Sequence, residues 1–159
     1  MITTDLYRQV MGNWGTGVTV VTTRDGSGQP YGLTVSSFTS VSMDPILVLV
    51  CLDDRLSGLQ HFKSSMNFGV SILSETQQEV SRLFAKKDTV RPADLYFNGE
   101  TGIPLIRDSL VTLECETTAI YDGGDHQIYL GKVLAAELHG AMQGTKPLLY
   151  FRGKYEKLP

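Results

Sequence analysis

The sequence has few cysteines and none of the short spacings that bind metal ions. Cys51 and Cys115 are its only cysteines, each lies in an apolar, strand-like segment, and there is no C-x-x-C pair. We therefore expect two buried free thiols in a reducing compartment rather than a disulfide. His61, His126 and His139 have no partner at metal-ligand spacing, so no metal site is predicted.

Strong positive charge and long apolar runs are also absent. The 14 basic residues form no cluster and are outnumbered by 17 acidic ones, so the charge pattern that supplies most nucleic-acid affinity is missing. The longest apolar run, 46–52, is far shorter than the ~18 residues that span a bilayer, and residues 1–10 lack a signal-peptide pattern. We expect a single cytoplasmic domain over residues 1–159, without a nucleic-acid or membrane partner.

The segments that are present predict a mainly β protein. Sixteen glycines, about one residue in ten against an average near 7%, favour many turns. Two β-branched segments flank the turn-rich segment 25–30 and predict a hairpin, and the apolar run 46–52 predicts a strand buried on both faces. A tight turn at Asp122-Gly123-Gly124-Asp125 joins two long strands. The other expected strands are 17–23, 31–38, 67–73, 113–121, 126–138 and 148–155.

Three short helices are expected between these strands. Thr3 to Met11 has apolar residues at helical spacing, and 57–65 has two more. A third helix begins at Ser74, where Gln77 completes a capping box, and ends at Lys86-Lys87. Segment 89–107 is rich in proline, glycine and charge and is predicted to be a long surface loop. About seven strands without βαβ alternation favour an antiparallel barrel over a doubly wound sheet.

The common catalytic motifs are missing, and three local features remain. The sequence contains no G-x-G-x-x-G, G-x-x-x-x-G-K-[ST], G-x-S-x-G or H-E-x-x-H pattern. Segment 32–40 carries closely spaced hydroxyls that could surround a phosphate or the polar edge of a heteroaromatic ring, although a water-facing edge strand has the same composition. Gly123-Gly124-Asp125-His126 presents an imidazole beside a turn, and Phe84-Ala85-Lys86-Lys87 places an aromatic ring and two cations at a helix end. Each of these also has an ordinary structural explanation.

Taken in order, these features resemble the flavin reductase family of FMN-binding split-barrel proteins. The resemblance runs from about Trp14 to Tyr155, and the ordered set of segments is more specific than any one of them. The segments are Thr16-Gly17-Val18-Thr19-Val20-Val21-Thr22, then 32–42 leading through Asp44-Pro45 into 47–52, then 67–73, Phe84-Ala85-Lys86-Lys87, and Gly124-Asp125-His126 before 128–133.

The resemblance implies a homodimeric, six-stranded antiparallel Greek-key split barrel with a few short helices. It implies that the protein binds FMN or FAD, oxidises NADH or NADPH, and supplies reduced flavin to a separate monooxygenase. His126 matches the family's contact to the nicotinamide nucleotide, and Tyr155 is expected near the same opening. The residues that match the family's flavin contacts are Thr34, Val35, Ser36, Ser37, Cys51, Leu52, Ser57, Phe84, Ala85 and Lys86.

No catalytic side chain is predicted, because hydride passes directly between the two cofactors once their rings are stacked. The loop 53–58 departs from the family in carrying two acids. Two other functions stay open at this point: a module of the same fold that keeps its flavin and turns over little NAD(P)H, and an enzyme that acts directly on an organic substrate. The residues do not distinguish NADH from NADPH, since no Rossmann-type ribose contact is present.

Overall fold

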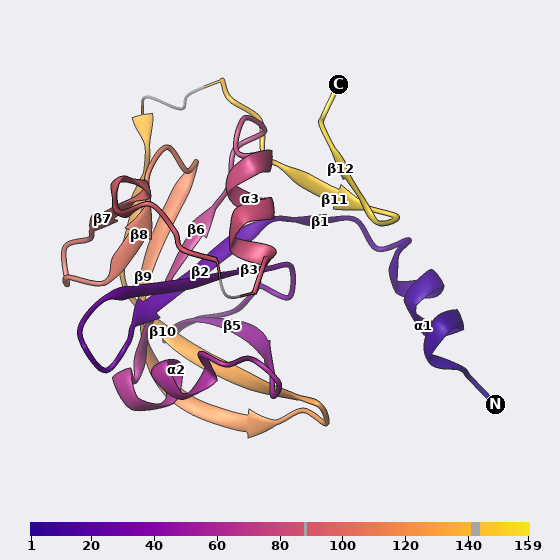
Figure 1. The fold of residues 1–159 in the computed structure, drawn as a ribbon, viewed down its shortest axis with the longest axis horizontal. Helices are drawn as coiled ribbons and strands as arrows, with labels where there is room; N and C mark the ends of the chain where they lie inside the picture. Colours follow the sequence, from indigo (N-terminus) through magenta and orange to yellow (C-terminus); the bar gives the residue numbers. More distant parts are fainter. Residues whose placement is uncertain (88, 141–143) are drawn as a thin grey trace.

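A seven-stranded antiparallel sheet forms the body of the protein (Figure 1). The computed structural model describes residues 1–87, 89–140 and 144–159. In chain order the strands are β2 (Thr19–Arg24), β3 (Pro30–Val35), β4 (Thr39–Met43), β5 (Ile46–Asp53), β6 (Asn67–Ile72), β9 (Val111–Asp122) and β10 (His126–Leu138). Their spatial order is β3-β2-β6-β9-β10-β5-β4.

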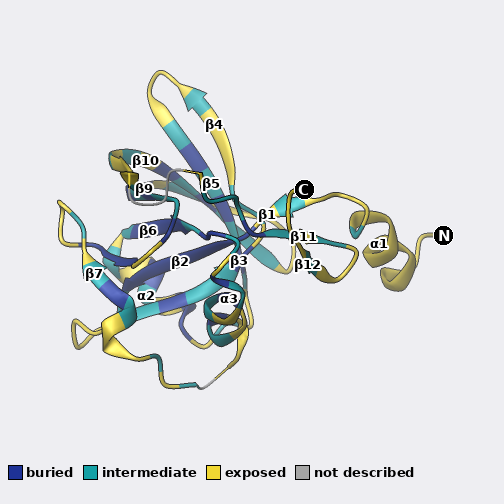
Figure 2. Ribbon diagram, turned by 90° about the horizontal axis from the view of Figure 1, so that it is seen from above, coloured by how far each residue is buried: buried dark blue, intermediate teal, exposed yellow. Residues whose placement is uncertain are grey.

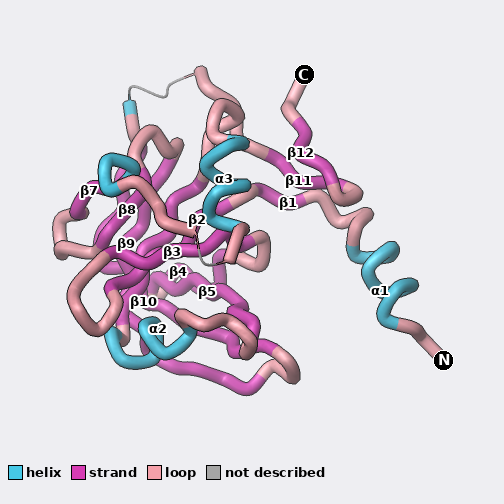
Figure 3. Tube along the Cα trace, viewed as in Figure 1, coloured by secondary structure: helices cyan, strands magenta, loops and turns pink. Residues whose placement is uncertain are grey.

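Two smaller sheets and four short helical segments complete the fold (Figure 3). The smaller sheets contain β1 (Thr16–Gly17) with β11 (Leu149–Phe151) and β12 (Lys154–Glu156), and β7 (Tyr96–Asn98) with β8 (Pro104–Ile106). The helices are α1 (Thr4–Met11), α2 (Leu59–Ser65), α3 (Gln78–Ala85) and the 3₁₀ segment η1 (Ala93–Leu95). Helices α2 and α3 contact the sheet, whereas α1 projects away from it.

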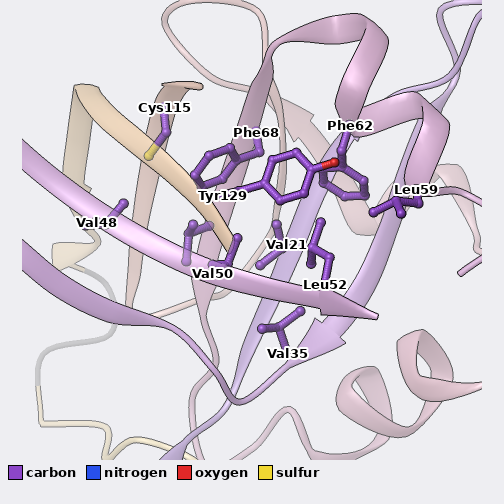
Figure 4. Close-up of a cluster of buried hydrophobic side chains, with 11 residues drawn as sticks. Val21, Val35, Val48, Val50, Leu52, Leu59, Phe62, Phe68, Cys115 and Tyr129 are labelled. Carbon is purple, nitrogen blue, oxygen red and sulfur yellow. The ribbon is translucent and has the colours of Figure 1, made fainter. Parts of the chain in front are cut away.

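The long sheet curls until the loop after β3 meets β5. The Ser37 hydroxyl accepts a hydrogen bond from the Cys51 N–H and donates one to the Cys51 carbonyl, both at 2.9 Å. Inside this curved sheet, the Tyr129 ring lies between Phe68 and Phe62 in a fully buried core (Figure 4). The expected antiparallel barrel with a few short helices is therefore present.

The strand that is buried on both faces is β2, not β5 as the apolar run predicted. Residues of β5 alternate between buried and partly exposed positions, because no helix covers the outer face of that strand in the described residues. Successive residues Val20 and Val21 of β2 belong to different core clusters, since α3 and β8 cover the outer face of β2. A run of apolar residues therefore did not distinguish a central strand from one with an uncovered face.

Three other predicted segments differ from the expectation. Segment 89–107 is not a plain surface loop: it contains η1, β7 and β8, and the Thr22 hydroxyl donates to the Pro104 carbonyl. The last expected strand, 148–155, is the hairpin β11–β12, because Arg152 and Gly153 adopt positive φ angles. The strand expected over 31–38 ends at Val35, and an additional strand, β4, follows it.

The third helix begins later than its capping box predicted. Helix α3 starts at Gln78. The Ser74 N–H nevertheless donates to the Gln77 side-chain oxygen at 3.0 Å, so this hydrogen bond of the capping box forms about one turn before the helix begins. Thr3 caps α1 as expected, with its hydroxyl accepting from the Leu6 N–H at 3.2 Å.

Both cysteines are free, but only one is buried. Cys115 is fully buried, and this burial raises the pKa of its thiol to about 12, so the thiol stays protonated at neutral pH. Cys51 is only half-buried, because it lies on the uncovered outer face of β5. The expectation of two buried thiols is therefore wrong for Cys51.

Candidate functional site

Strand β3 and the loop after it bring several predicted flavin residues together. The Thr34 hydroxyl donates to the Ser81 carbonyl on α3 at 2.7 Å, while Ser37 is hydrogen-bonded to Cys51 on β5. Strand β3 is the last strand of the seven-stranded sheet and pairs only with β2. Its outer edge therefore lies between α3 and β5, where the backbone groups of a terminal strand remain open to a ligand.

A small cleft opens beside this strand. Its volume is about 170 Å³, and two of its walls come from β3 and α3. The C-terminal hairpin supplies a further wall, held by a 2.8 Å hydrogen bond between the Tyr155 and Ser81 hydroxyls. The lining residues are Val18, Thr34, Ser36, Ser81, Ala85, Tyr150 and Tyr155.

Three of the predicted flavin residues have side chains that face the core instead. Val35 and Leu52 belong to the cluster inside the curved sheet, and Phe84 belongs to a second cluster beneath α3. Each is at most 5% exposed. Strand alternation explains Leu52, since Cys51 beside it points outward. The side chains of these three residues are therefore not available to a ligand.

Ser57 and Lys86 are both exposed, at the start of α2 and the end of α3. The loop that carries Ser57 is held against β3 by the Tyr31 ring, which occupies the space a side chain at Gly58 would need. Glycine at position 58 therefore allows the close approach of this loop to the sheet.

His126 lies at the first position of β10, directly opposite Asp53 on β5. Its Nδ1 is 2.7 Å from Oδ1 of Asp125, which orients the half-exposed ring. The Arg55 guanidinium binds Asp53 at 2.6 Å and holds the pKa of that carboxyl well below its usual range. Asp53, one of the two acids of this loop, thus belongs to a local ion pair.

Tyr155 does not share an opening with His126 within one chain. It contacts α3 and lines the small cleft, whereas Figure 1 shows β12 well separated from the turn between β9 and β10. The family resemblance placed these two residues near one opening. It could not show their separation within one chain, because a resemblance gives no information about which end of the sheet each strand reaches.

No sequence pattern predicted Ser81 and Tyr150 as site residues, and none predicted a second, larger cleft between α1 and the sheet. The larger cleft has a volume of about 740 Å³ and includes Ser36 and Ser37 in its wall. Helix α1 has apolar residues on one face, yet none of its residues is buried. The amphipathic spacing predicted the helix correctly, but it could not show that the helix stays exposed among the described residues.

Metal ligands and membrane helices are not seen in the part of the chain that the structure describes. No three His, Cys, Asp or Glu side chains there are arranged to hold a metal ion. No helix there has the length and apolar character needed to cross a bilayer.

Comparison with known proteins gives the family. The family model described as "Flavin reductase like domain" matches residues 11–159. The chain belongs to the flavin reductase family.

Relatives within this family carry consistent names. The chain is 38% identical over 158 residues to the NADH-dependent FAD reductase of Streptomyces globisporus, covering 94% of this chain and 83% of the relative. It is 35% identical over 158 residues to the NADH-dependent flavin reductase StyB of Pseudomonas fluorescens, covering 96% and 89%. A probable flavin reductase of Rhizobium meliloti is 41% identical over 149 residues; the match covers 93% of this chain but only 47% of that relative, so the chain spans about half its length.

Solved flavin reductases share the fold. The flavin reductase PheA2 superposes with a TM-score of 0.89 at 33% identity, covering 99% of both chains. BorF, the reductase component of a bacterial two-component tryptophan halogenase, gives 0.89 at 36% identity, again covering 99% of both chains. The predicted split-barrel fold and the predicted membership of the flavin reductase family are confirmed.

Proposed function

We propose that this chain is an NAD(P)H:flavin oxidoreductase that acts in the cytoplasm as a homodimer and releases reduced FMN or FAD to a separate monooxygenase. The observation that carries the proposal is the gathering of Thr34, Ser36 and Ser37 on one open strand edge, bordered by α3 and β5. Hydroxyls and open backbone groups of this kind suit the polar edge of a flavin ring.

The residues of this edge fit a flavin in distinct ways. The exposed Ser36 hydroxyl is available to a ligand, whereas Thr34 and Ser37 are held by Ser81 and Cys51 and so fix the shape of the edge. Cys51 offers an apolar surface beside it on β5, and Ala85 offers one on α3. Ser57 and Lys86 would hold the phosphate, whereas Val35, Leu52 and Phe84 would support the site from the core.

The bound flavin supplies the capacity to accept a hydride from the nicotinamide. The protein has to orient the two rings with their reacting atoms roughly 3 to 3.5 Å apart, so it needs no nucleophile of its own. His126, fixed by Asp125, would contact the nicotinamide nucleotide from the β9–β10 turn. Tyr155 stands beside Ser81 at the flavin end of the site, and we assign it to the flavin wall.

Multiple-turnover flavin reduction is the direct test. Purified chain mixed anaerobically with excess FMN or FAD and with NADH or NADPH should bleach the flavin absorbance over many turnovers. Ser36→Ala should raise the KM for FMN by roughly 5- to 10-fold, the effect of one lost hydrogen bond, and leave the KM for the nicotinamide unchanged. Absence of turnover with every pair would refute the reductase, and flavin that stays bound through dialysis would favour the electron-transfer module.

The homodimer is proposed from an uncovered apolar face. Helices α2 and α3 contact β2, β3 and β6, so the outer surface of β4, β5 and β10 lies away from both helices (Figure 2). Exposed apolar surface on one side of a sheet can mark an interaction site. The exposed apolar side chains on these strands and on β9 are Val41, Met43, Ile46, Tyr121, Leu134 and Leu138.

Sedimentation equilibrium tests this assembly. The chain should sediment at double its 17.5 kDa mass, and Leu134→Glu should shift the population toward monomer by placing a charge in the apolar face. The control Lys63→Glu changes an exposed residue of α2, away from that face. A monomeric parent chain, or an equal effect of both variants, would show that this face is not the interface.

A further inference from the structure

The C-terminal hairpin forms one wall of the small cleft without belonging to the main sheet. Strands β11 and β12 lie in the separate sheet β1-β11-β12, and β12 pairs with β11. Figure 1 shows this hairpin to one side of the main sheet, next to α3. Among the described residues, no strand pairing joins β12 to the main sheet. Side-chain contacts therefore have to set the distance between this wall and the strand edge that we assign to the flavin.

The contacts that hold the hairpin wall converge on Ser81 of α3. Ser81 is fully buried, and its hydroxyl is 2.8 Å from the hydroxyl of Tyr155 on β12. The guanidinium of the next residue, Arg82, lies 5.6 Å from the centre of the Tyr155 ring, which is a cation–π distance. A hydrogen bond and a ring contact from adjacent residues thus fix β12 against α3.

Ser81 also holds the opposite wall of the cleft, which is strand β3. Its carbonyl accepts a hydrogen bond from the Thr34 hydroxyl at 2.7 Å. A carbonyl oxygen has two lone pairs, so it can accept this bond and still take part in the helix. Because the Thr34 proton is used in this way, Thr34 has only its lone pairs to offer a ligand in the cleft. Such an acceptor suits the N–H group on the polar edge of an oxidised flavin ring.

We infer that Ser81 is a positioning residue of the flavin site. Its hydroxyl sets the place of the hairpin wall through Tyr155, and its carbonyl sets the direction of the Thr34 hydroxyl. Ser81 acts through these two neighbours, because its own hydroxyl is already bonded. The inference rests on the proposed flavin reductase function, and it adds a residue to which the family resemblance gave no role.

Three variants test whether Ser81 and Tyr155 act through their shared hydrogen bond. Ser81→Ala removes the bond from α3, Tyr155→Phe removes it from β12 and keeps the ring, and the third variant combines the two. Quenching of flavin fluorescence measures FMN affinity without any nicotinamide. Each single variant should weaken FMN binding about 5-fold, the effect of one lost hydrogen bond. The double variant should weaken it no further, because both substitutions remove the same bond.

Ser71→Ala is the matched control for a purely structural effect. Ser71 is also fully buried, and its hydroxyl accepts from the Ile106 N–H at 3.0 Å, but it does not line the small cleft. Both Ser71→Ala and Ser81→Ala should lower the Tm, whereas only Ser81→Ala should change FMN affinity. In steady-state kinetics, Ser81→Ala should raise the KM for FMN by the same factor of about 5 and leave kcat within 2-fold of the parent value.

Two results would overturn the inference. One is parent-like FMN affinity in both single variants, and the other is multiplication of their effects in the double variant, since the two residues would then act independently. Tyr155→Phe carries the test if Ser81→Ala does not fold, because it removes one hydroxyl from a partly exposed residue.

Turnover of the parent chain reports the proposed function separately. A parent that binds FMN but does not reduce it with NADH or NADPH would refute the reductase and leave the comparison of affinities intact. A parent that reduces FMN while Ser81→Ala binds it equally well would refute only the role of Ser81. A parent that does not bind FMN would refute both.

Discussion

Replacing Glu114 with alanine is expected to lower the free energy of unfolding by about 3 to 5 kcal/mol, because it removes a buried carboxylate that accepts three part-buried hydrogen bonds. Glu114 is 4% exposed on β9. Its Oε1 accepts from the Glu100 N–H at 2.7 Å, and its Oε2 accepts from the Thr101 N–H at 2.8 Å and from the Thr101 hydroxyl. One carboxylate therefore holds the loop between β7 and β8 against the main sheet.

The size of the loss follows from the absence of any substitute. Gly99 lies so close to the carboxylate that a side chain there would overlap it, so the loop is shaped around this one group. With alanine at position 114, the donors of Glu100 and Thr101 lose their acceptor, and each unmet donor costs about 1 to 3 kcal/mol. Glu114→Gln keeps one acceptor oxygen and should cost less than half as much as alanine.

Urea denaturation of the parent, Glu114→Ala and Glu114→Gln measures the effect. The matched control is Glu116→Ala, because Glu116 lies on the same strand but is exposed. It should change the free energy of unfolding by less than about 0.5 kcal/mol. Equal losses for positions 114 and 116 would mean that strand propensity, rather than the three hydrogen bonds, accounts for the effect.

Local sequence patterns predicted which helices and strands form more accurately than they predicted which of their faces are covered. Helix α1, the β2–β3 hairpin and the long β9–β10 hairpin follow from residues close together in the sequence, through capping, β-branching and turn-forming glycines. Whether a face is covered depends on distant segments. The alternating burial of β5, the doubly buried β2 and the uncovered apolar face of α1 could therefore not be predicted from their own residues.

The candidate site shows the same division. Thr34, Ser36 and Ser37 lie within four residues, so a pattern could find them, and the family resemblance gave them a role. The Ser81–Tyr155 hydrogen bond joins residues 74 positions apart and places Tyr155 in the small cleft. The pairing of Arg8 with Arg152 in one cleft depends on the contact of the Arg152 N–H with the Gly12 carbonyl at 2.9 Å. Neither contact can be predicted from residues that are neighbours in the sequence.

Replacing His126 with alanine is expected to raise the KM for the nicotinamide nucleotide by about 10- to 100-fold, and to leave flavin affinity within about 2-fold of the parent value. The factor corresponds to roughly 1.5 to 3 kcal/mol, the range for one hydrogen bond to a charged group. The KM for the nicotinamide and the flavin affinity are expected to respond differently because the two contacts lie in different places. His126 lies at the β9–β10 turn, whereas Thr34 and Ala85 line the cleft beside α3.

Steady-state kinetics with varied NADH at saturating FMN give the first quantity, and quenching of flavin fluorescence gives the second. His61→Ala is the matched control, because His61 is also partly exposed but contacts the Tyr31 ring on the other side of β3 from α3. Asp125→Ala should give a smaller rise in KM than His126→Ala, since it frees the imidazole ring without removing it. A His126→Ala chain that loses flavin binding, with its nicotinamide KM unchanged, would show that His126 belongs to the flavin wall and that the dinucleotide enters elsewhere.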